Sequence, residues 1–271
     1  MMHKRWVVRT VSVALASGAF FCALATASAE PVPVCKAPSD LTRLDRPLAH
    51  TALRLLAREP VKIVAIGSSS TAGAGASAPA NAYPSQLEIA LKKKFPGEDI
   101  TVVNRGVNGE ITSDMLARFD RDVLAEKPDL VLWQVGSNVV LRDQSVETSA
   151  EQMREGVKRL KDAGIDVVLV NIQYSPAMNS HREAQAMVDL IDATAKEANI
   201  GVFHRYTVMK YWRDGENLPF GIFVTADGVH MNDWGYRCWA RLMADALAEA
   251  ATRPTASANA LPLHAASPPG R

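Results

Sequence analysis

Four short segments of this chain carry side chains that together could cleave an ester. A serine-rich loop contains Ser69, two later loops contain Gly109 and Asn138, and an Asp-x-x-His segment contains Asp227 and His230. A serine hydroxyl becomes an effective nucleophile when a base takes its proton, and a third group must hold that base in one tautomer. We therefore expect Ser69 to be the nucleophile, His230 the general base and Asp227 the residue that orients it.

The same chemistry needs hydrogen-bond donors for the oxyanion of the tetrahedral intermediate. The side-chain amide of Asn138 and the backbone N–H groups of Ser69 and Gly109 can supply them, and glycine lets the backbone approach closely. Each residue alone is more commonly part of a turn or a helix cap. Their occurrence together and in this order favours a catalytic interpretation.

Five short β-branched runs alternate with helical patterns and must position these residues. The expected strands cover residues 61–66, 100–104, 130–135, 167–172 and 201–206. Apolar residues recur at helical spacing in residues 48–58, 115–123, 153–160, 187–195 and 232–252. Strands that are apolar throughout, between amphipathic helices, predict a parallel sheet covered on both faces. The fold class is thus a three-layer α/β/α sandwich with a five-stranded parallel sheet.

Ligands of open parallel sheets bind outside the carboxyl ends of the strands. The loops after the first three expected strands are residues 67–73, 104–110 and 136–138, and they hold Ser69, Gly109 and Asn138. We expect these loops to meet at one edge of the sheet. Trp133 and Phe203, on expected strands, are assigned to the core.

These segments resemble, in order, the sequence blocks of the SGNH hydrolases, the GDSL-type esterases, over residues 61 to about 247. The resemblance implies a flavodoxin-like sandwich and a serine esterase. It assigns Ser69 as nucleophile, Gly109 and Asn138 to the oxyanion hole, and Asp227 and His230 to the closing Asp-x-x-His. Two positions depart from the family pattern, because Ser68 and Val139 stand where the family usually has aspartate. These departures bear on the hydrogen bonding of the first loop and on the shape of the acyl pocket.

The first 29 residues have the pattern of a signal peptide. Lys4, Arg5 and Arg9 precede an apolar run that ends in an Ala-Ser-Ala site before Glu30. We expect cleavage there, a periplasmic or secreted protein, a domain over residues 30–252 and a disordered tail over 253–271 that is rich in Pro, Ala and Ser. Removing residues 1–29 takes away three basic side chains and leaves a net charge of −2, so nothing favours nucleic-acid binding.

After cleavage the chain keeps two cysteines, Cys35 and Cys238. An even pair in an exported protein permits a disulfide, which would join the amino-terminal segment to the last helix. The remaining histidines, His50, His181, His204 and His264, lack a carboxylate three residues earlier and are assigned surface or structural roles.

The expected substrate carries a short acyl group, above all acetyl, on a sugar or another polyhydroxylated alcohol. Residues 209–226 contain four aromatic side chains that either form a rim of the site or pack beneath the loop: Tyr211, Trp212, Phe220 and Phe223. Val139 and Val140 could line a small acyl pocket. No extended apolar lid or amphipathic docking helix follows the leader, which argues against long acyl chains.

Other functions use the same pattern and stay open. An O-acyltransferase, a lysophospholipase or a thioesterase would share the acyl-enzyme, and a glycan-binding protein would share the fold. A flavin-binding, flavodoxin-like protein would explain the polar first loop but not Asp227, His230 and Asn138. No cofactor or metal is expected, since the zinc motifs His-Glu-x-x-His and paired Cys-x-x-Cys are missing. A triphosphatase loop does not fit, because Gly67 and Gly73 are separated by five residues and Ala74 replaces lysine.

Overall fold

The computed structural model describes residues 32–253. The expected signal peptide, His264 and the tail from residue 254 lie outside the described residues. The compact unit that holds the candidate residues begins at Cys35. Within residues 32–253, no helix combines the length and the apolar character that crossing a membrane requires.

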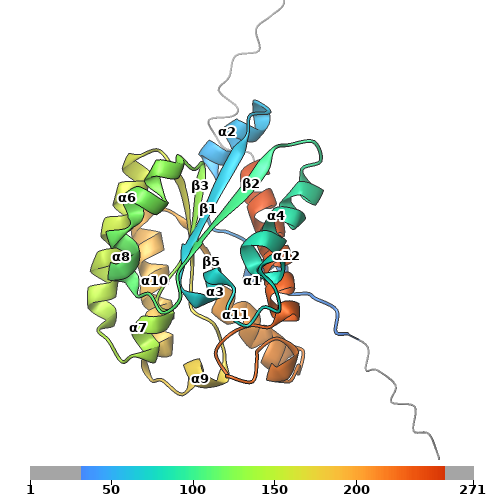
Figure 1. Ribbon diagram of the computed structural model, residues 1–271, viewed down its shortest axis with the longest axis vertical. Helices are drawn as coiled ribbons and strands as arrows, with labels where there is room; N and C mark the ends of the chain where they lie inside the picture. Colours follow the sequence, from blue (N-terminus) through green and yellow to red (C-terminus); the bar gives the residue numbers. More distant parts are fainter. Residues whose placement is uncertain (1–31, 254–271) are drawn as a thin grey trace, which may run out of the picture. The chain divides into compact units, whose positions relative to one another are not determined.

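A five-stranded parallel sheet forms the centre of this unit (Figure 1). Its strands are β1 (Val61–Gly67), β2 (Ile100–Gly106), β3 (Leu130–Gln134), β4 (Asp166–Val170) and β5 (Gly201–Phe203), in the order β2-β1-β3-β4-β5. In the register of the central strands, Gly67 pairs with Gly106 and Ile66 pairs with Trp133. The carboxyl ends of the first three strands are therefore neighbours.

Helices cover both faces of the sheet (Figure 1). One face packs against α4 (Tyr83–Lys94) and α12 (Asp233–Thr252), and the other against α8 (Val146–Asp162) and α10 (Glu183–Ala198). Shorter helices connect these elements: α1 (Ser39–Thr42), α2 (Ala49–Leu56), α3 (Ser69–Ala72), α5 (Thr112–Ala117), α6 (Phe119–Asp122), α7 (Ser137–Leu141), α9 (Pro176–Asn179), α11 (Arg205–Lys210), the 3₁₀ turns η1 (Pro79–Asn81), η2 (Leu124–Glu126) and η4 (Phe220–Ile222), and the π turn η3 (Tyr211–Gly215). The predicted fold class is confirmed.

Alternation along the strands separates the core into two clusters. Ile63 of β1 faces α4 and α12, whereas Val64 and Ile66 face α8 and α10. Trp133 belongs to the second cluster and Phe203 to the first, and both are fully buried. The apolar strands thus have two buried faces, as a parallel sheet requires.

Some predicted elements differ from the observed ones. The fifth strand ends at Phe203, and Arg205 begins α11, because the Asn171 side chain accepts a hydrogen bond from the backbone N–H of Tyr206 (3.0 Å) and so caps this helix. The helical pattern over residues 115–123 is broken at Arg118, where the chain leaves helical geometry between α5 and α6. The helix α4, which begins with Tyr83 and Pro84, is an element that the sequence pattern does not predict.

A disulfide joins Cys35 to Cys238 of α12. The same amino-terminal segment is also held by Trp212, whose indole N–H donates to the backbone oxygen of Lys36 (3.0 Å). The segment before α1 is therefore fixed on the cluster formed by α12 and the loop after β5.

Candidate active site

The turn between β1 and α3 presents Ser69 at the end of the sheet. Ser68 and Ser70 are 2% exposed, whereas Ser69 is partly exposed. The side-chain oxygen of Gln134 accepts hydrogen bonds from the backbone N–H of Ser68 (3.0 Å), the Ser68 hydroxyl (3.1 Å) and the Thr71 hydroxyl (3.2 Å). Gln134 of β3 thus holds the first loop. The turn into α3 thus buries Ser68 and Ser70 and leaves Ser69 accessible.

Two residues that pack against the turn into α3, Gly67 and Gly106, must be glycine. A Cβ atom on Gly67 would lie 2.2 Å from the Thr71 hydroxyl oxygen, and one on Gly106 would lie 2.1 Å from the backbone nitrogen of Ala72. Both separations are far below van der Waals contact. Glycine at the ends of β1 and β2 therefore allows α3 to sit directly against the sheet.

The structure brings Ser69, His230 and Asp227 into one hydrogen-bonded line. His230 Nε2 lies 2.8 Å from Ser69 Oγ, and His230 Nδ1 lies 2.6 Å from Asp227 Oδ2. A carboxylate only accepts hydrogen bonds, so the imidazole proton resides on Nδ1. Nε2 then carries a lone pair that faces the serine hydroxyl, which is the arrangement of a nucleophile and its base.

A short loop before α12 fixes the carboxylate. Asp227 Oδ1 accepts hydrogen bonds from the Thr225 hydroxyl (2.6 Å) and from the backbone N–H groups of Val229 (2.8 Å) and His230 (3.0 Å). Partial burial acts to raise the pKa of Asp227, but the hydrogen bonds from Thr225, His230 and the backbone outweigh it and hold this pKa well below its usual range. Asp227 therefore stays ionised beside the imidazole.

The loops that hold Gly109 and Asn138 carry candidate hydrogen-bond donors for an oxyanion. Gly109 has φ +80°, a left-handed conformation that suits glycine, and Arg142 donates to its carbonyl (2.6 Å). Asn138 uses one side-chain N–H to bind the Glu110 carbonyl (2.8 Å), which leaves its second N–H available. Among the turn and loop hydrogen bonds of residues 32–253, none is donated by the backbone N–H of Ser69 or Gly109.

A buried ion pair holds the loop that contains Gly109. The Arg118 side chain is 7% exposed, and its Nε donates to both carboxylate oxygens of Glu110 (2.9 Å each). Its Nη2 also donates to the backbone oxygens of Arg105 (2.9 Å) and Gly67 (3.4 Å). One guanidinium thereby links the second loop to the ends of β1 and β2.

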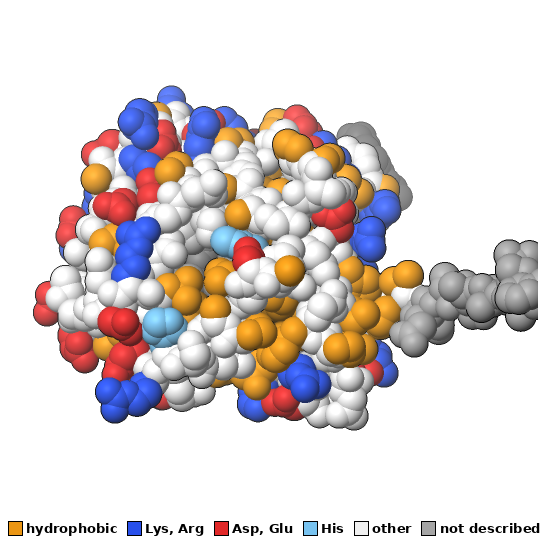
Figure 2. All heavy atoms as spheres, turned by 60° about the horizontal axis from the view of Figure 1, so that its bottom comes forward, with side chains coloured by type: hydrophobic (Ala, Val, Ile, Leu, Met, Phe, Trp, Pro, Cys, Tyr) orange, Lys and Arg blue, Asp and Glu red, His pale blue; other side chains and the backbone are white. Residues whose placement is uncertain are grey.

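A cleft of about 370 Å³ opens over these groups. It is lined by Ser69, Ala74, Asn108, Gly109, Ser137, Asn138, Leu141, Gln173, Val229 and His230. Figure 2 turns the lower end of Figure 1 toward the reader and shows a histidine beside an acidic side chain, with hydrophobic side chains close by. Asp227 lies behind His230, and the other four of the five predicted catalytic and oxyanion-hole residues line this cleft: Ser69, Gly109, Asn138 and His230.

The predicted aromatic rim and acyl pocket differ from what is observed. Trp212 and Phe223 are at most 1% exposed and pack in the core, and none of the four aromatic residues of 209–226 lines the cleft. Val139 and Val140 are also buried in the core, and Leu141 is the apolar side chain of α7 that reaches the cleft. Trp212 and Phe223 therefore pack beneath the loop, and Tyr211 and Phe220 are partly buried against the same core cluster.

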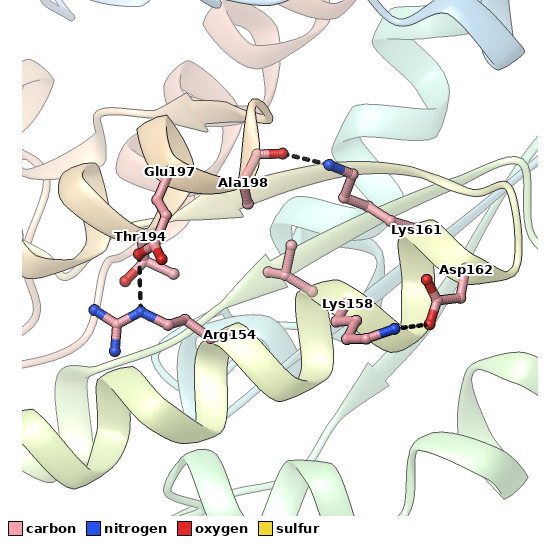
Figure 3. Close-up of a pocket in the computed structure, with 8 residues that line it drawn as sticks. Arg154, Lys158, Lys161, Asp162, Thr194, Glu197 and Ala198 are labelled. Carbon is pink, nitrogen blue, oxygen red and sulfur yellow. Dashed lines mark hydrogen bonds and ion pairs between the residues drawn. The ribbon is translucent and has the colours of Figure 1, made fainter.

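A second hollow, of about 390 Å³, lies between α8 and α10 (Figure 3). Its cations are already paired: Arg154 with Glu197 (2.9 Å) and Lys158 with Asp162 (2.5 Å), while Lys161 donates to the Ala198 carbonyl. The hollow holds no nucleophile with a base beside it. The candidate chemistry lies in the cleft over Ser69.

The other described histidines each lie near a carboxylate but outside the cleft. His50 pairs with Asp129 (2.9 Å) and His181 with Asp143 (3.0 Å), and His204 lies 3.5 Å from Asp192. Of the histidines in residues 32–253, His230 is the one whose ring is hydrogen-bonded to a serine. The described residues contain no cluster of His, Cys, Asp and Glu suited to a metal ion.

Several supporting residues were not identified from the sequence. Gln134, Arg118 and Thr225 hold the three loops, yet each looks like an ordinary polar residue in the chain. Gln134 could have been noticed as a polar residue at the end of an otherwise apolar strand.

A five-stranded parallel sandwich with Ser, His and Asp at the carboxyl ends of its strands is the architecture of the SGNH hydrolases. The chain belongs to the Non-GDSL lipase-like family, whose family model matches residues 34–253. The predicted resemblance to SGNH hydrolases is confirmed.

Relatives with similar sequences are esterases. The chain is 33% identical to an arylesterase of Vibrio mimicus over 94 residues, which are 35% of this chain and 46% of that protein. It is 37% identical to an acetylxylan esterase of Geobacillus stearothermophilus over 62 residues, which are 23% of this chain and 28% of that protein. The chain thus matches less than half the length of these two relatives. The esterase TesA of Pseudomonas aeruginosa is 26% identical over 54% of this chain and 70% of its own length.

Solved structures share the fold. A two-domain esterase active on acetylated mannans superposes with a TM-score of 0.67 at 22% identity, over 81% of this chain and 58% of that one. Axe2, an acetylxylan esterase from Geobacillus stearothermophilus, gives a TM-score of 0.59 at 21% identity, over 69% of this chain and 94% of that one. At these identities the likeness shows the sandwich fold.

Proposed function

We propose that this chain is an exported serine esterase that removes short acyl groups, above all acetyl, from carbohydrate or other polyhydroxylated alcohols. The observation that carries the proposal is the His230 imidazole, which lies 2.8 Å from Ser69 Oγ and 2.6 Å from Asp227 Oδ2. A serine held against a base that is itself held by a carboxylate is the arrangement that activates a hydroxyl for acyl transfer.

Acylation follows from these positions. Ser69 Oγ attacks the ester carbonyl carbon while His230 Nε2 takes the hydroxyl proton, and Asp227 stabilises the imidazolium that forms. The carbonyl oxygen becomes an oxyanion and receives hydrogen bonds from the N–H groups of Ser69 and Gly109 and from the free N–H of Asn138. When the carbon–oxygen bond to the alcohol breaks, His230 returns its proton to the alcohol, and the acyl group stays on Ser69.

Deacylation reverses these roles with water. His230 takes a proton from a water molecule, the resulting nucleophile attacks the acyl-Ser69 carbonyl, and the proton passes to Ser69 Oγ as the carboxylic acid leaves. Asp227 is 48% exposed and His230 is 22% exposed as side chains, so solvent reaches the base. This access supports hydrolysis as the fate of the acyl-enzyme.

The size and lining of the cleft support a small acyl group. Its volume of about 370 Å³ is near the lower end of the range of small-molecule sites, and only a few of its lining side chains, such as Leu141 and Val229, are apolar. Relatives that act on acetylated xylan and the structural neighbour active on acetylated mannans support a carbohydrate acetate. Export of the chain rests on the leader-like residues 1–29 and is supported by the Cys35–Cys238 disulfide, since disulfides persist in oxidising compartments.

The experiment is a comparison of kcat/KM for nitrophenyl esters of two to sixteen carbons and for partially acetylated xylan and mannan. The two-carbon ester and the acetylated glycans are expected to be the best substrates, and Ser69→Ala is expected to remove their turnover. The matched control is Ser180→Ala, because Ser180 is an exposed serine outside the cleft. A tenfold or greater preference for long-chain esters, about 1.4 kcal/mol, would replace this proposal with a lysophospholipase or thioesterase function.

A further inference from the structure

Gln173 lies in the cleft beside the catalytic groups but has no part in the acyl transfer described above. It follows β4, the strand next to β3, and lines the same cleft as Ser69 and Asn138. Its residue exposure is 2%, so its side chain is a fixed part of the cleft floor.

Two donors determine the orientation of the Gln173 amide. Its side-chain oxygen accepts hydrogen bonds from Arg205 Nη2 (2.9 Å) and from the Ser137 hydroxyl (2.7 Å). Arginine can only donate, so the atom that faces Arg205 must be the amide oxygen and the –NH₂ group must lie on the other side. The –NH₂ end of the amide therefore points into the cleft.

The Gln173 –NH₂ group has no acceptor among residues 32–253. No hydrogen bond is made by its nitrogen, and this nitrogen is not one of the fully buried polar atoms that lack a partner. It is therefore accessible from the cleft that Gln173 lines. The cleft floor holds two unused N–H bonds in a fixed direction.

Arg205 keeps this donor in place. Its guanidinium is 1% exposed, donates to the Asn171 carbonyl (3.1 Å) and lies over the Trp239 ring, 4.9 Å from its centre. Its hydrogen-bond partners in residues 32–253 are neutral oxygens and not carboxylates, and burial lowers the pKa of Arg205. A buried cation without a counter-ion depends on neutral oxygens such as that of Gln173, so the Gln173 amide is not free to turn over.

We propose that the Gln173 N–H group donates a hydrogen bond to an oxygen of the substrate alcohol next to the ester, and so selects esters of polyhydroxylated alcohols. This inference rests on the esterase activity proposed above. The ester carbonyl oxygen already has donors from Ser69, Gly109 and Asn138, and an acetyl group offers no other acceptor. A sugar or glycerol ester always has an oxygen on the neighbouring carbon, whereas an apolar alcohol would cover the Gln173 N–H without replacing its hydrogen bond to water.

The test compares two acetates that differ by one atom in the alcohol. In 2-methoxyethyl acetate an ether oxygen occupies the position that a methylene group occupies in butyl acetate. For each enzyme, kcat/KM for the ether is divided by kcat/KM for the butyl ester. Comparing this ratio between a variant and the wild type cancels the intrinsic reactivity of the two esters. Gln173→Leu is expected to lower this ratio about 3- to 10-fold, the effect of one hydrogen bond.

A second variant covers the case in which Gln173→Leu does not fold. Gln173→Glu keeps oxygen acceptors for Arg205 and Ser137 but replaces the donor with a carboxylate oxygen, so it is expected to lower the ratio at least as far. Gln185→Leu is the matched control, because Gln185 is an exposed glutamine of α10 whose side chain binds only Asp189 (2.8 Å). Its ratio should equal that of the wild type.

The outcomes separate this inference from the esterase proposal. An unchanged ratio in a folded Gln173 variant overturns the inference alone, and so does an equal fall in kcat/KM for both esters, which would place Gln173 at the ester group itself. If the wild type cleaves neither these esters nor nitrophenyl acetate, both proposals fail together.

Discussion

Replacing Asn138 with alanine should remove one of three donors to the oxyanion while leaving the Ser69–His230–Asp227 line intact. Asn138 donates one N–H to the Glu110 carbonyl (2.8 Å) and keeps the second for substrate. Loss of one oxyanion donor typically lowers kcat by about 10² to 10³, or about 2.7 to 4 kcal/mol of transition-state stabilisation. Separately, loss of the hydrogen bond to the Glu110 carbonyl should lower the free energy of unfolding by about 1 kcal/mol.

These two effects can be separated by assay. The first is measured as kcat and KM with nitrophenyl acetate, and KM should change much less than kcat, because the donor acts mainly in the transition state. The second is measured as the free energy of unfolding in urea. Arg142→Ala is the control for loosening the loop, because it removes the hydrogen bond to the Gly109 carbonyl (2.6 Å) without removing a donor to the oxyanion.

The contrast between the two variants decides the point. The kcat of Asn138→Ala should be at least tenfold lower than that of Arg142→Ala when both variants are assayed in the folded state. A kcat within threefold of the wild type in Asn138→Ala would remove Asn138 from the oxyanion hole. Equal losses in the two variants would mean that loop order, and not the donor, controls the rate.

Two further predictions concern pH and stability. The pKa of Asp227 is lowered in the folded state, so its carboxylate adds stability that is complete above the unfolded pKa of about 3.9 and is lost as the pH falls from there through the folded pKa. The free energies of unfolding of the wild type and Asp227→Asn should therefore converge in acid. A constant difference between them down to pH 2 would refute this prediction. Replacing Cys35 and Cys238 with serine should lower the free energy of unfolding by about 2 to 4 kcal/mol, since the disulfide closes a loop with a sequence separation of 203; two free thiols in the unreduced, denatured wild type would show that the bond is not made.

The sheet and the approximate positions of its strands could be predicted because burial on two faces leaves a strong pattern. The first strand of the prediction, residues 61–66, is one residue shorter than β1, and the loops that follow β1, β2 and β3 meet as expected. The predicted fifth strand extended three residues too far. Tyr206 has a local preference for strands, but a tertiary contact, the cap from Asn171 to Tyr206, starts a helix there. Local patterns do not contain such contacts.

The candidate site likewise contains residues that the local sequence predicts and residues that it does not. Asp227 and His230 are close in the chain, so their contact follows from local geometry, and Ser69 was placed by its position after a strand. Gln134 and Arg205 were not found, because their importance comes from hydrogen bonds to residues far away in the sequence, such as Ser68 and Gln173. Their residue types alone carry no such information.

The central claim is that Ser69 is activated by His230 and becomes acylated, and a fluorophosphonate probe tests it most directly. Mass spectrometry of the labelled protein should show one probe per chain, on the peptide that contains Ser69. Ser69→Ala should not be labelled, and His230→Ala should be labelled far more slowly, because the hydroxyl loses its base. A probe found on Ser68 or Ser70, or undiminished labelling of Ser69→Ala, would contradict the account.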